Sequence, residues 1–453
     1  MTNRLFTKSF FVLLFIIFST FLCNAQSTIT TIAGDGITQY IGDGYPATIF
    51  SLAQPYGICE DKNGTIYVAD FADHRIRKIN IQDTLFTFCG TGTSGYSGDG
   101  GLIDTAKIRN PSGICIDTAG NLYITEWYNN VVRKVDKSTH IVTTVCGTGA
   151  YGFSGDNGPA TNAHLADPYA SCIDNEGNIY IPDAGNNRIR KVDMHTGTIT
   201  TVAGSGVMGF SGDNMPATNA KLSNPMGVCV DSLGNIYIAD NGNHRIRKVD
   251  AITGIITTIA GNGVQGYFGD GGLAINSLIA QPNAICNDRF GNIYFSDFGN
   301  NVIRTIYTNG TIKTIAGNGH YGFSGDNGPA ANATFNGATG IIVNDSGYIY
   351  ISDGGNSAIR KVSPLNLGIY DENNNGNPIQ IFPNPTHSII TLSIINISEL
   401  QFFEIVNPIG QVIYSAKIAA GNTVLNLSAW SAGIYFIHLY GQKEYMQKIL
   451  LLK

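Results

Sequence analysis

Charged residues are scarce in this chain of 453 residues, and they do not gather into basic clusters. They make up 13% of the sequence, and the formal net charge is −6. A nucleic-acid interface needs a basic stripe or patch, and the scattered Arg-Lys pairs do not form one, so we expect no nucleic-acid partner. The 43% of hydrophobic residues is typical of a folded body, and the length is sufficient for two domains.

Paired metal-ligand motifs are absent as well. None of the eight cysteines stands in a C-x-x-C pair, and the eight histidines form no cluster, so we expect no metal site on thiolates or imidazoles and no cofactor. Five cysteines instead occupy one recurring position, where a sixth copy of the segment has isoleucine. A position that accepts both residue types predicts a small buried apolar site; its residues are Cys59, Cys115, Cys172, Cys229, Cys286 and Ile342.

Long hydrophobic runs are also missing, apart from one near the N-terminus. Residues 10–22 are apolar but too few to span a membrane, and basic residues precede them. Together with a small-residue site, this pattern predicts a secretory signal peptide over residues 1–25, cleaved between Ala25 and Gln26. Cys23 would also allow a lipoprotein signal, although the residues before it are bulkier than usual. We expect a mature chain without a membrane span.

A segment of 56 or 57 residues recurs six times between residues 42 and 361. Each copy contains a Gly-Asp pair, and an arginine always follows the aspartate 34 positions later. A fixed period of this kind indicates a repeat architecture. The aspartates are Asp43, Asp99, Asp156, Asp213, Asp270 and Asp326, and the arginines are Arg77, Arg133, Arg190, Arg247, Arg304 and Arg360.

Four short runs with the alternation of β-strands make up each copy. In the fourth copy they cover residues 227–231, 235–240, 245–249 and 256–260, with Gly, Asn and Asp between them. Four antiparallel strands form one blade of a β-propeller. The last copy ends after its third strand, whereas residues 28–33 match a fourth strand. We therefore predict an all-β, six-bladed propeller over residues 26–363, closed by its N-terminal strand.

The repeat resembles the NHL-repeat propellers. The resemblance covers nearly the whole repeat region, but NHL relatives include interaction modules, outer domains of sensors and a few lyases, so it implies the fold and not the function. The NHL lyases would place several metal-binding histidines near the central channel, and that pattern is absent here. The residues that carry the resemblance are 224–227, 234–240 and 243–249 and their counterparts in the other copies.

Two acidic positions recur beside the constant arginine. The first, at the end of the second strand, precedes the arginine by seven residues, and a pair across the tight turn would pin the hairpin. The second is the Gly-Asp aspartate, for which we expect an Asx turn that opens the long loop. A calcium-binding ring of six carboxylates is the alternative. The second-strand acids are Asp70, Glu126, Asp183, Asp240, Asp297 and Asp353.

A polar residue precedes each first strand, at the expected mouth of the central channel. Gluconolactonase-like propellers hold a divalent metal there with carboxylate and amide oxygens. That resemblance implies an alternative function, a metal-dependent lactonase or lyase-like hydrolase with ligands Asp167, Asn110 and Asn224. Structural hydrogen bonding is the other interpretation, because only Asp167 carries a charge. The six positions are Gln54, Asn110, Asp167, Asn224, Gln281 and Gly337.

The residue just after the second-strand acid differs between the copies, and such a difference could mark a ligand site. Phe71, Trp127 and Phe298 occupy this position in three copies, and Tyr128 follows Trp127. The long loops and the turns that hold these residues should share one face, so the aromatic side chains could form a patch for a glycan or a protein. Packing onto their own loops is the alternative.

The composition and the strand pattern of the sequence change after the repeats. Residues 364–378 are polar and predict a linker, and roughly seven short strands over residues 379–453 predict a small Ig-like β-sandwich. This tail resembles the C-terminal sorting domain of the type IX secretion system of Bacteroidetes. The resemblance implies recognition by that secretion machinery and delivery to the outer-membrane surface or the medium. It rests on residues 382–386, 427–435 and 448–453.

These observations favour a secreted or surface-attached propeller of a Gram-negative bacterium. We predict a monomeric, non-catalytic binding module that takes a protein or glycan ligand on the face crowned by the long loops. The hydrolase with its site near Asp167 is the alternative.

Overall fold

The computed structural model describes residues 27–38 and 40–364, and, in the C-terminal part, residues 379–382, 389–394, 400–406, 412–417, 422–431, 433–441 and 445–451. The chain divides into two compact units, one over residues 27–365 and one that includes residues 366–453. The expected signal peptide with its Ala25-Gln26 cleavage site, and nearly all of the expected linker, lie outside the described residues.

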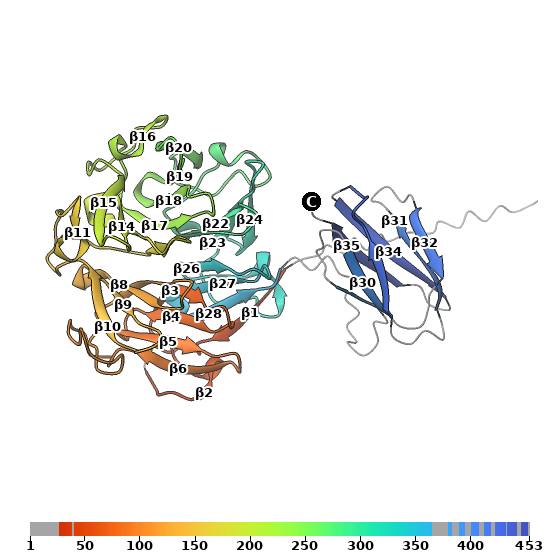
Figure 1. Ribbon diagram of the computed structural model, residues 1–453, viewed down its shortest axis with the longest axis horizontal. Helices are drawn as coiled ribbons and strands as arrows, with labels where there is room; N and C mark the ends of the chain where they lie inside the picture. The colour runs from red at the N-terminus through yellow and green to blue at the C-terminus, as the bar shows by residue number, and fades with distance from the viewer. Residues whose placement is uncertain are drawn as a thin grey trace, which may run out of the picture. The chain divides into compact units, whose positions relative to one another are not determined.

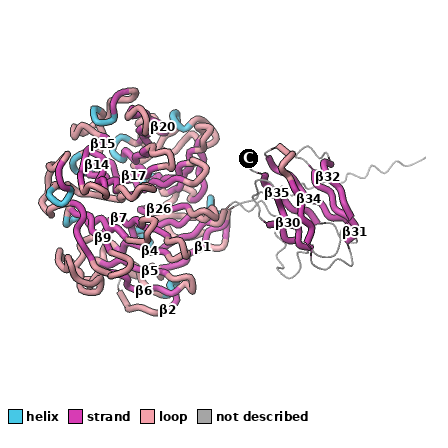
Figure 2. Tube along the Cα trace, viewed as in Figure 1, coloured by secondary structure: helices cyan, strands magenta, loops and turns pink. Residues whose placement is uncertain are grey.

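Six antiparallel sheets make up the described part of the first unit (Figure 1). Each has four main strands, which are consecutive in the chain in five of the sheets, and in the sixth sheet β1 pairs with the last three strands. The short helical turns lie between strands (Figure 2). Blade one contains β3 (Pro55–Glu60), β4 (Ile66–Asp70), β5 (Arg75–Ile79) and β6 (Thr84–Cys89); blade two β7 (Pro111–Ile116), β8 (Leu122–Glu126), β9 (Val131–Val135) and β10 (Val142–Cys146); blade three β12 (Cys172–Ile173), β13 (Ile179–Asp183), β14 (Arg188–Asp193) and β15 (Thr198–Ala203).

The other three blades repeat this order. Blade four contains β17 (Pro225–Val230), β18 (Ile236–Asp240), β19 (Arg245–Val249) and β20 (Ile255–Ala260); blade five β21 (Pro282–Asn287), β22 (Ile293–Asp297), β23 (Val302–Ile306) and β24 (Ile312–Ala316); blade six β26 (Ala338–Val343), β27 (Ile349–Asp353), β28 (Ala358–Val362) and β1 (Thr28–Ala33). Four two-residue strands extend the outer edges: β2 (Tyr45–Pro46), β11 (Gly158–Pro159), β16 (Met215–Pro216) and β25 (Gly328–Pro329).

Short 3-10 turns fall in two classes. One class lies in the long loops between blades: η1 (Ala47–Ile49), η3 (Ala160–Asn162), η5 (Ala217–Asn219), η7 (Ala274–Asn276) and η9 (Ala330–Asn332). The other joins the second and third strands of a blade: η2 (Trp127–Asn129), η4 (Ala184–Asn186), η6 (Asn241–Asn243), η8 (Phe298–Asn300) and η10 (Gly354–Asn356).

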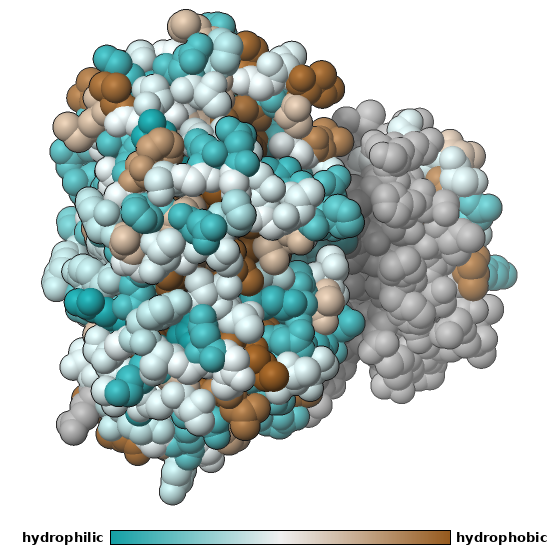
Figure 3. Space-filling view, turned by 60° about the vertical axis from the view of Figure 1, so that its left-hand side comes forward, coloured by the Kyte–Doolittle hydropathy of each residue, from teal (hydrophilic) through white to brown (hydrophobic). Residues whose placement is uncertain are grey.

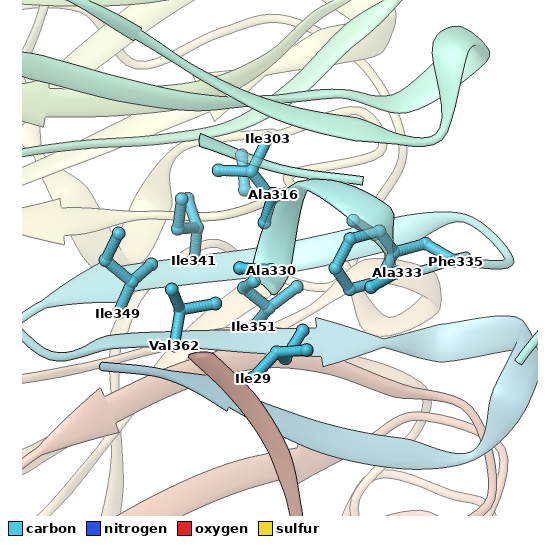
Figure 4. Close-up of a cluster of buried hydrophobic side chains, with 12 residues drawn as sticks. Ile29, Ile303, Ala316, Ala330, Ala333, Phe335, Ile341, Ile349, Ile351 and Val362 are labelled. Atoms are coloured by element: carbon cyan, nitrogen blue, oxygen red, sulfur yellow. The ribbon is translucent and has the colours of Figure 1, made fainter. Parts of the chain in front are cut away.

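The ring closes through the N-terminal strand. Strand β1 pairs antiparallel with β28, with Ile29 opposite Val362, so the first residues of the unit complete the last blade. Ile29 is fully buried and packs in the core cluster with Val362, Ile351 and Phe335 (Figure 4). The predicted six-bladed propeller, closed head to tail, is confirmed.

Strand pairing fixes which connections share a face. In blade four, Pro225 at the start of β17 lies opposite Asp240 at the end of β18, and Asp240 lies opposite Arg245 at the start of β19. The long loops and the turns after the second strands therefore lie on one face, as predicted. We call it the crowned face; the remaining hairpin turns lie on the opposite face.

A fully buried arginine ties each blade together. In blade three, Arg190 Nη1 lies 3.2 Å from Asp183, and its Nη2 lies 2.7 Å from Asp156. Thr201 of the fourth strand, β15, donates its hydroxyl to Asp156 at 2.7 Å, and the ring of Phe153 lies 4.8 Å from the guanidinium. The expected pairing with the second-strand acid is confirmed. The expected Asx turn is wrong, because the Gly-Asp carboxylate accepts from arginine and threonine instead.

The second unit is built of two antiparallel sheets in its described residues. One has the order β29 (Ile379–Phe382), β30 (Ile389–Ile394), β33 (Asn422–Asn426); the other has the order β32 (Val412–Lys417), β31 (Leu400–Val406), β34 (Gly433–Gly441), β35 (Tyr445–Leu451). Phe403 and Ile437 of the second sheet and Leu425 of the first are buried. This arrangement agrees with the predicted small β-sandwich.

Hydrophobic side chains also reach the surface of the propeller. Figure 3 shows one face, on which they lie in small groups between hydrophilic ones. Exposed single residues of this kind include Leu233 and Ile252. Scattered exposure is normal for a folded protein, so hydrophobicity by itself does not mark the site.

Candidate binding site at the mouth of the channel

Aromatic residues from three neighbouring blades meet on the crowned face. Phe71 and Trp127, at the ends of β4 and β8, have ring centroids 5.7 Å apart. Tyr128 stacks on Trp127 at 5.6 Å with an interplanar angle of 13°. The structure thus brings together three of the four aromatic residues that the sequence analysis singled out.

Two tyrosines that the sequence analysis missed complete this group. Tyr56 stacks on Phe71 at 4.2 Å, and Tyr169 meets Trp127 edge to face at 5.3 Å and Tyr56 at 5.9 Å. Each follows the proline at the start of a first strand. At this position the other copies have Ser112, Met226, Asn283 and Thr339, so a copy-to-copy comparison could have found both. We call Tyr56, Phe71, Trp127, Tyr128 and Tyr169 the aromatic mouth cluster.

The cluster has a buried base and an accessible ledge. Tyr169 is buried, and the amide of Asn283, from blade five, donates to its hydroxyl at 3.4 Å, so the base of the cluster also contacts blade five. Burial raises the pKa of both Tyr169 and Tyr56, and Tyr56 is the less buried of the two. Trp127 is half-buried, whereas Tyr128 is 50% exposed and has the Arg109 guanidinium 5.2 Å from its ring.

Asp167 holds the tryptophan of this cluster in place. Its Oδ1 accepts a hydrogen bond of 2.8 Å from Trp127 Nε1. The hydroxyl of Tyr151 is also hydrogen-bonded to Asp167, whose charge raises the pKa of Tyr151. This carboxylate therefore already has two protein donors. Its role at the mouth is to hold the ring of Trp127 in position.

The other mouth positions are explained by backbone conformation. Asn110, Asp167 and Asn224 have φ values of 46°, 49° and 50°. This left-handed region favours Asn, Asp and Gly over most residues. Asn110 Nδ2 also donates to the carbonyl oxygen of Phe71 at 3.2 Å. Among the described residues, no group of three or more His, Cys, Asp or Glu side chains is arranged to hold a metal ion.

Phe298 does not join the aromatic mouth cluster. It follows Asp297 at the end of β22, and its ring lies against Gly337 of the next blade, where an added Cβ would come within 3.0 Å. Gly337 also has a positive φ of 70°. The missing side chain at this mouth position thus makes room for the phenylalanine ring.

Comparison with known families agrees with this architecture. The NHL repeat matches residues 52–79 and 222–249, in blades one and four. The secretion system C-terminal sorting domain matches residues 380–453. The chain is an NHL-repeat propeller with a sorting domain. The sorting domain directs type IX export, so the NHL propeller is secreted or attached to the outer-membrane surface of a Gram-negative bacterium.

Individual relatives share the propeller and not the whole chain. SUPPRESSOR OF QUENCHING 1 of Arabidopsis thaliana is 26% identical over 263 residues, which is 56% of this chain and 25% of that protein. The chain spans 25% to 39% of the length of the first curated relatives. Two solved structures from Bacteroides thetaiotaomicron share the fold: a protein of unknown function (20% identity, TM-score 0.56, 74% of this chain and 76% of that one) and an auxiliary nutrient binding protein (18%, 0.54, 75% and 77%).

No helix in the described ranges is long and apolar enough to cross a bilayer.

Histidines of the NHL propeller fasten neighbouring blades. Nδ1 of His74 accepts a hydrogen bond of 3.2 Å from the backbone N–H of Asn110, and His244 does the same for Gln281 at 3.1 Å. At three other blade junctions the acceptor of the equivalent backbone N–H is an asparagine Oδ1, that of Asn130, Asn187 or Asn301. The two imidazoles are therefore structural acceptors that must be neutral at Nδ1.

Replacement of His74 by asparagine is expected to make the propeller less sensitive to acid. Burial lowers the pKa of His74 below 6.5, so this residue contributes stability above that pH and loses it as the pH falls through the lowered pKa. Asparagine accepts the same bond at every pH. Urea unfolding at pH 7.5 and at pH 5 measures how much stability is lost on acidification. This loss should be smaller for His74→Asn than for the wild type, by about 0.5 kcal/mol; the effect is small because the imidazole is partly exposed.

A matched control is the exposed His320, which makes no inter-blade bond through its ring. His320→Asn should leave the pH dependence unchanged. An equal effect of both substitutions would contradict the role of His74.

The recurring cysteines line a central cavity on the other side of the ring from the aromatic mouth cluster. A central cavity of about 550 Å³ lies on the side of the opposite face and is lined by the five recurring cysteines and Ile342. The five cysteines are free; three of them are buried, as predicted, whereas Cys172 and Cys286 are half-buried. Burial raises the pKa of Cys115 to about 12, so these thiols stay protonated and unreactive at neutral pH. The residues are Cys59, Cys115, Cys172, Cys229 and Cys286.

Proposed function

We propose that the NHL propeller is a non-catalytic, extracellular binding module and that the aromatic mouth cluster is its ligand site. The observation that carries this proposal is the ledge of Trp127 and the half-exposed Tyr128 on a buried aromatic base. Aromatic side chains held rigidly at a surface supply large contact areas at a small cost in conformational entropy. Such a ledge suits the face of a sugar ring or an apolar side chain of a protein ligand.

The polar groups around the ledge support binding over catalysis. Asp167 accepts from Trp127 and Tyr151, and Asn110 donates to a main-chain oxygen. A hydrolase would need a carboxylate or a metal free to act on the substrate. Here the charged group at the mouth serves the aromatic ring instead.

Truncation of Trp127 is expected to abolish most ligand binding. A glycan and protein array with the purified secreted protein should yield ligands, and Trp127→Ala should weaken their binding about 30-fold, as for a central hot-spot residue. Tyr321→Ala is the matched control, because this tyrosine is 74% exposed on another long loop and belongs to no ring pair in the described structure. Unchanged binding by Trp127→Ala would contradict the proposed site.

The binding module and the alternative hydrolase predict different effects of replacing Asp167. Asparagine keeps an oxygen acceptor for Trp127 Nε1, so Asp167→Asn should retain ligand binding within about threefold. A stoichiometric divalent ion in the purified protein, lost together with lactone turnover in Asp167→Asn, would overturn the binding module in favour of the enzyme.

A further inference from the structure

A second cleft lies between blades one and two, away from the aromatic mouth cluster. Its volume is about 450 Å³, within the range of small-molecule sites. Its floor is apolar and contains Tyr67, Phe88, Ile103, Leu122 and Val135, and its rim carries Lys62, Lys78, Lys137 and His140. The hairpin turns that supply Lys62 and Lys137 belong to the face opposite the crowned face.

The lysines on this rim have no acidic partners. Lys134 with Asp136, at 3.7 Å, is the one lysine ion pair among the described residues, so Lys62, Lys78 and Lys137 are each without one. This is notable in a chain with a formal net charge of −6.

The two aspartates in the cleft are engaged in their own turns. Asp61 Oδ1 accepts the backbone N–H groups of Asn63 and Thr65, at 2.8 and 2.9 Å. Asp117 accepts from the backbone of Asn121 at 2.8 Å and from the hydroxyl of Tyr123 at 3.2 Å. The cleft is therefore lined by three lysines without an ion pair and by two aspartates that are already hydrogen-bonded.

The equivalent cleft between blades three and four has the opposite character. Its single lysine, Lys191, stands among acidic residues, and its ammonium lies 5.3 Å from the ring of Tyr180. In blade one, Phe88 packs edge to face on Tyr67 at 5.0 Å, and Lys78 has no ring partner in the described structure. The acidic residues of the other cleft are Asp174, Glu176, Asp231 and Asp250.

Tyr67 supplies a free hydrogen-bonding group on the floor of the cleft. The matching tyrosines of four other blades donate their hydroxyls to an aspartate of the first hairpin turn, at 3.0 to 3.3 Å. Tyr67 makes no such bond, and its hydroxyl oxygen is not one of the buried unpaired polar atoms of the described residues. The hydroxyl is therefore accessible from the cleft and is available to a ligand.

We propose that this cleft binds a small organic anion, a carboxylate on an aliphatic or aromatic body. The carboxylate lies between Lys62, Lys78 and Lys137 and accepts from the Tyr67 hydroxyl. The apolar body packs on Phe88 and the other apolar residues of the floor. This site is separate from the aromatic mouth cluster, so it goes beyond the proposed function.

Calorimetric titration of the purified secreted protein tests the site. The probes are 2-naphthoate and octanoate, which distinguish an aromatic from an aliphatic body; 2-naphthalenemethanol lacks the charge, and inorganic phosphate lacks the apolar body. We expect at least one carboxylate to bind tenfold or more tightly than either control. Lys78→Gln and Lys137→Gln should each weaken it about tenfold, and Tyr67→Phe several-fold, with melting temperatures that stay close to that of the wild type.

Lys191→Gln is the matched control, because it removes the equivalent lysine from the acidic cleft, and it should leave affinity unchanged. The proposal is overturned if neither carboxylate binds, if the alcohol or phosphate binds as tightly, or if Lys191→Gln has the same effect as Lys78→Gln.

Discussion

Replacement of Ile29 by aspartate is expected to open the ring and to cost about 4 kcal/mol or more of the free energy of unfolding. Ile29 is fully buried in the core of blade six and lies opposite Val362 in the last strand pair. Truncation of a buried isoleucine alone costs about 2 to 5 kcal/mol, and aspartate adds a buried carboxylate without a partner. Urea unfolding followed by circular dichroism measures the loss.

The control for this substitution is Ile252→Asp. Ile252 is 94% exposed in a hairpin turn of blade four, so its replacement should change stability by about 0.5 kcal/mol or less. A propeller that tolerates Ile29→Asp as well as Ile252→Asp would show that β1 does not contribute to closure.

Replacement of Arg190 by methionine is expected to cost about 3 to 5 kcal/mol, because it leaves two carboxylates without their shared partner. Asp183 is fully buried, and Asp156 is partly exposed. The neighbouring Lys191→Met, on the half-buried side of the same strand, should cost less than about 1 kcal/mol. Similar losses for both variants would contradict the central role of the buried arginine.

The pH dependence gives this prediction a second readout. Burial raises the pKa of Asp183 even with the arginine present, and loss of the arginine raises it further above its unfolded value. A carboxyl with a raised folded pKa favours folding at low pH, and this contribution is lost as the pH rises through that pKa. The cost of Arg190→Met should therefore be larger at pH 8 than at pH 5, and addition of Asp183→Asn should reduce the cost at pH 8.

The fold could be predicted from the sequence because the repeat settles it. Six copies at a constant spacing fix the number of blades, and the unmatched strand at residues 28–33 fixes the closure. The pairing of Asp156 with Arg190 was missed, although the constant separation of 34 residues was visible. A long loop separates the two, and only the path of that loop shows that the aspartate returns to the arginine and does not open a turn.

The candidate site could be predicted in part. Phe71 and Trp127 were found because they differ from their counterparts at a position that the repeat places on the crowned face. Tyr56 and Tyr169 were missed, since contacts between blades one and three depend on how side chains converge at the axis. Asp167 was considered at the mouth only as a metal ligand, because its hydrogen bond from Trp127 Nε1 depends on a ring from the neighbouring blade.

Hydrogen exchange tests the closed ring most directly. Strand β1 and strand β24 hold the same position in their blades, but only β1 reaches its blade from the other end of the propeller sequence. The account predicts that backbone amides of β1 are protected as strongly as those of β24 and exchange only with global unfolding. Rapid exchange in β1 alongside full protection in β24 would contradict closure by the N-terminal strand.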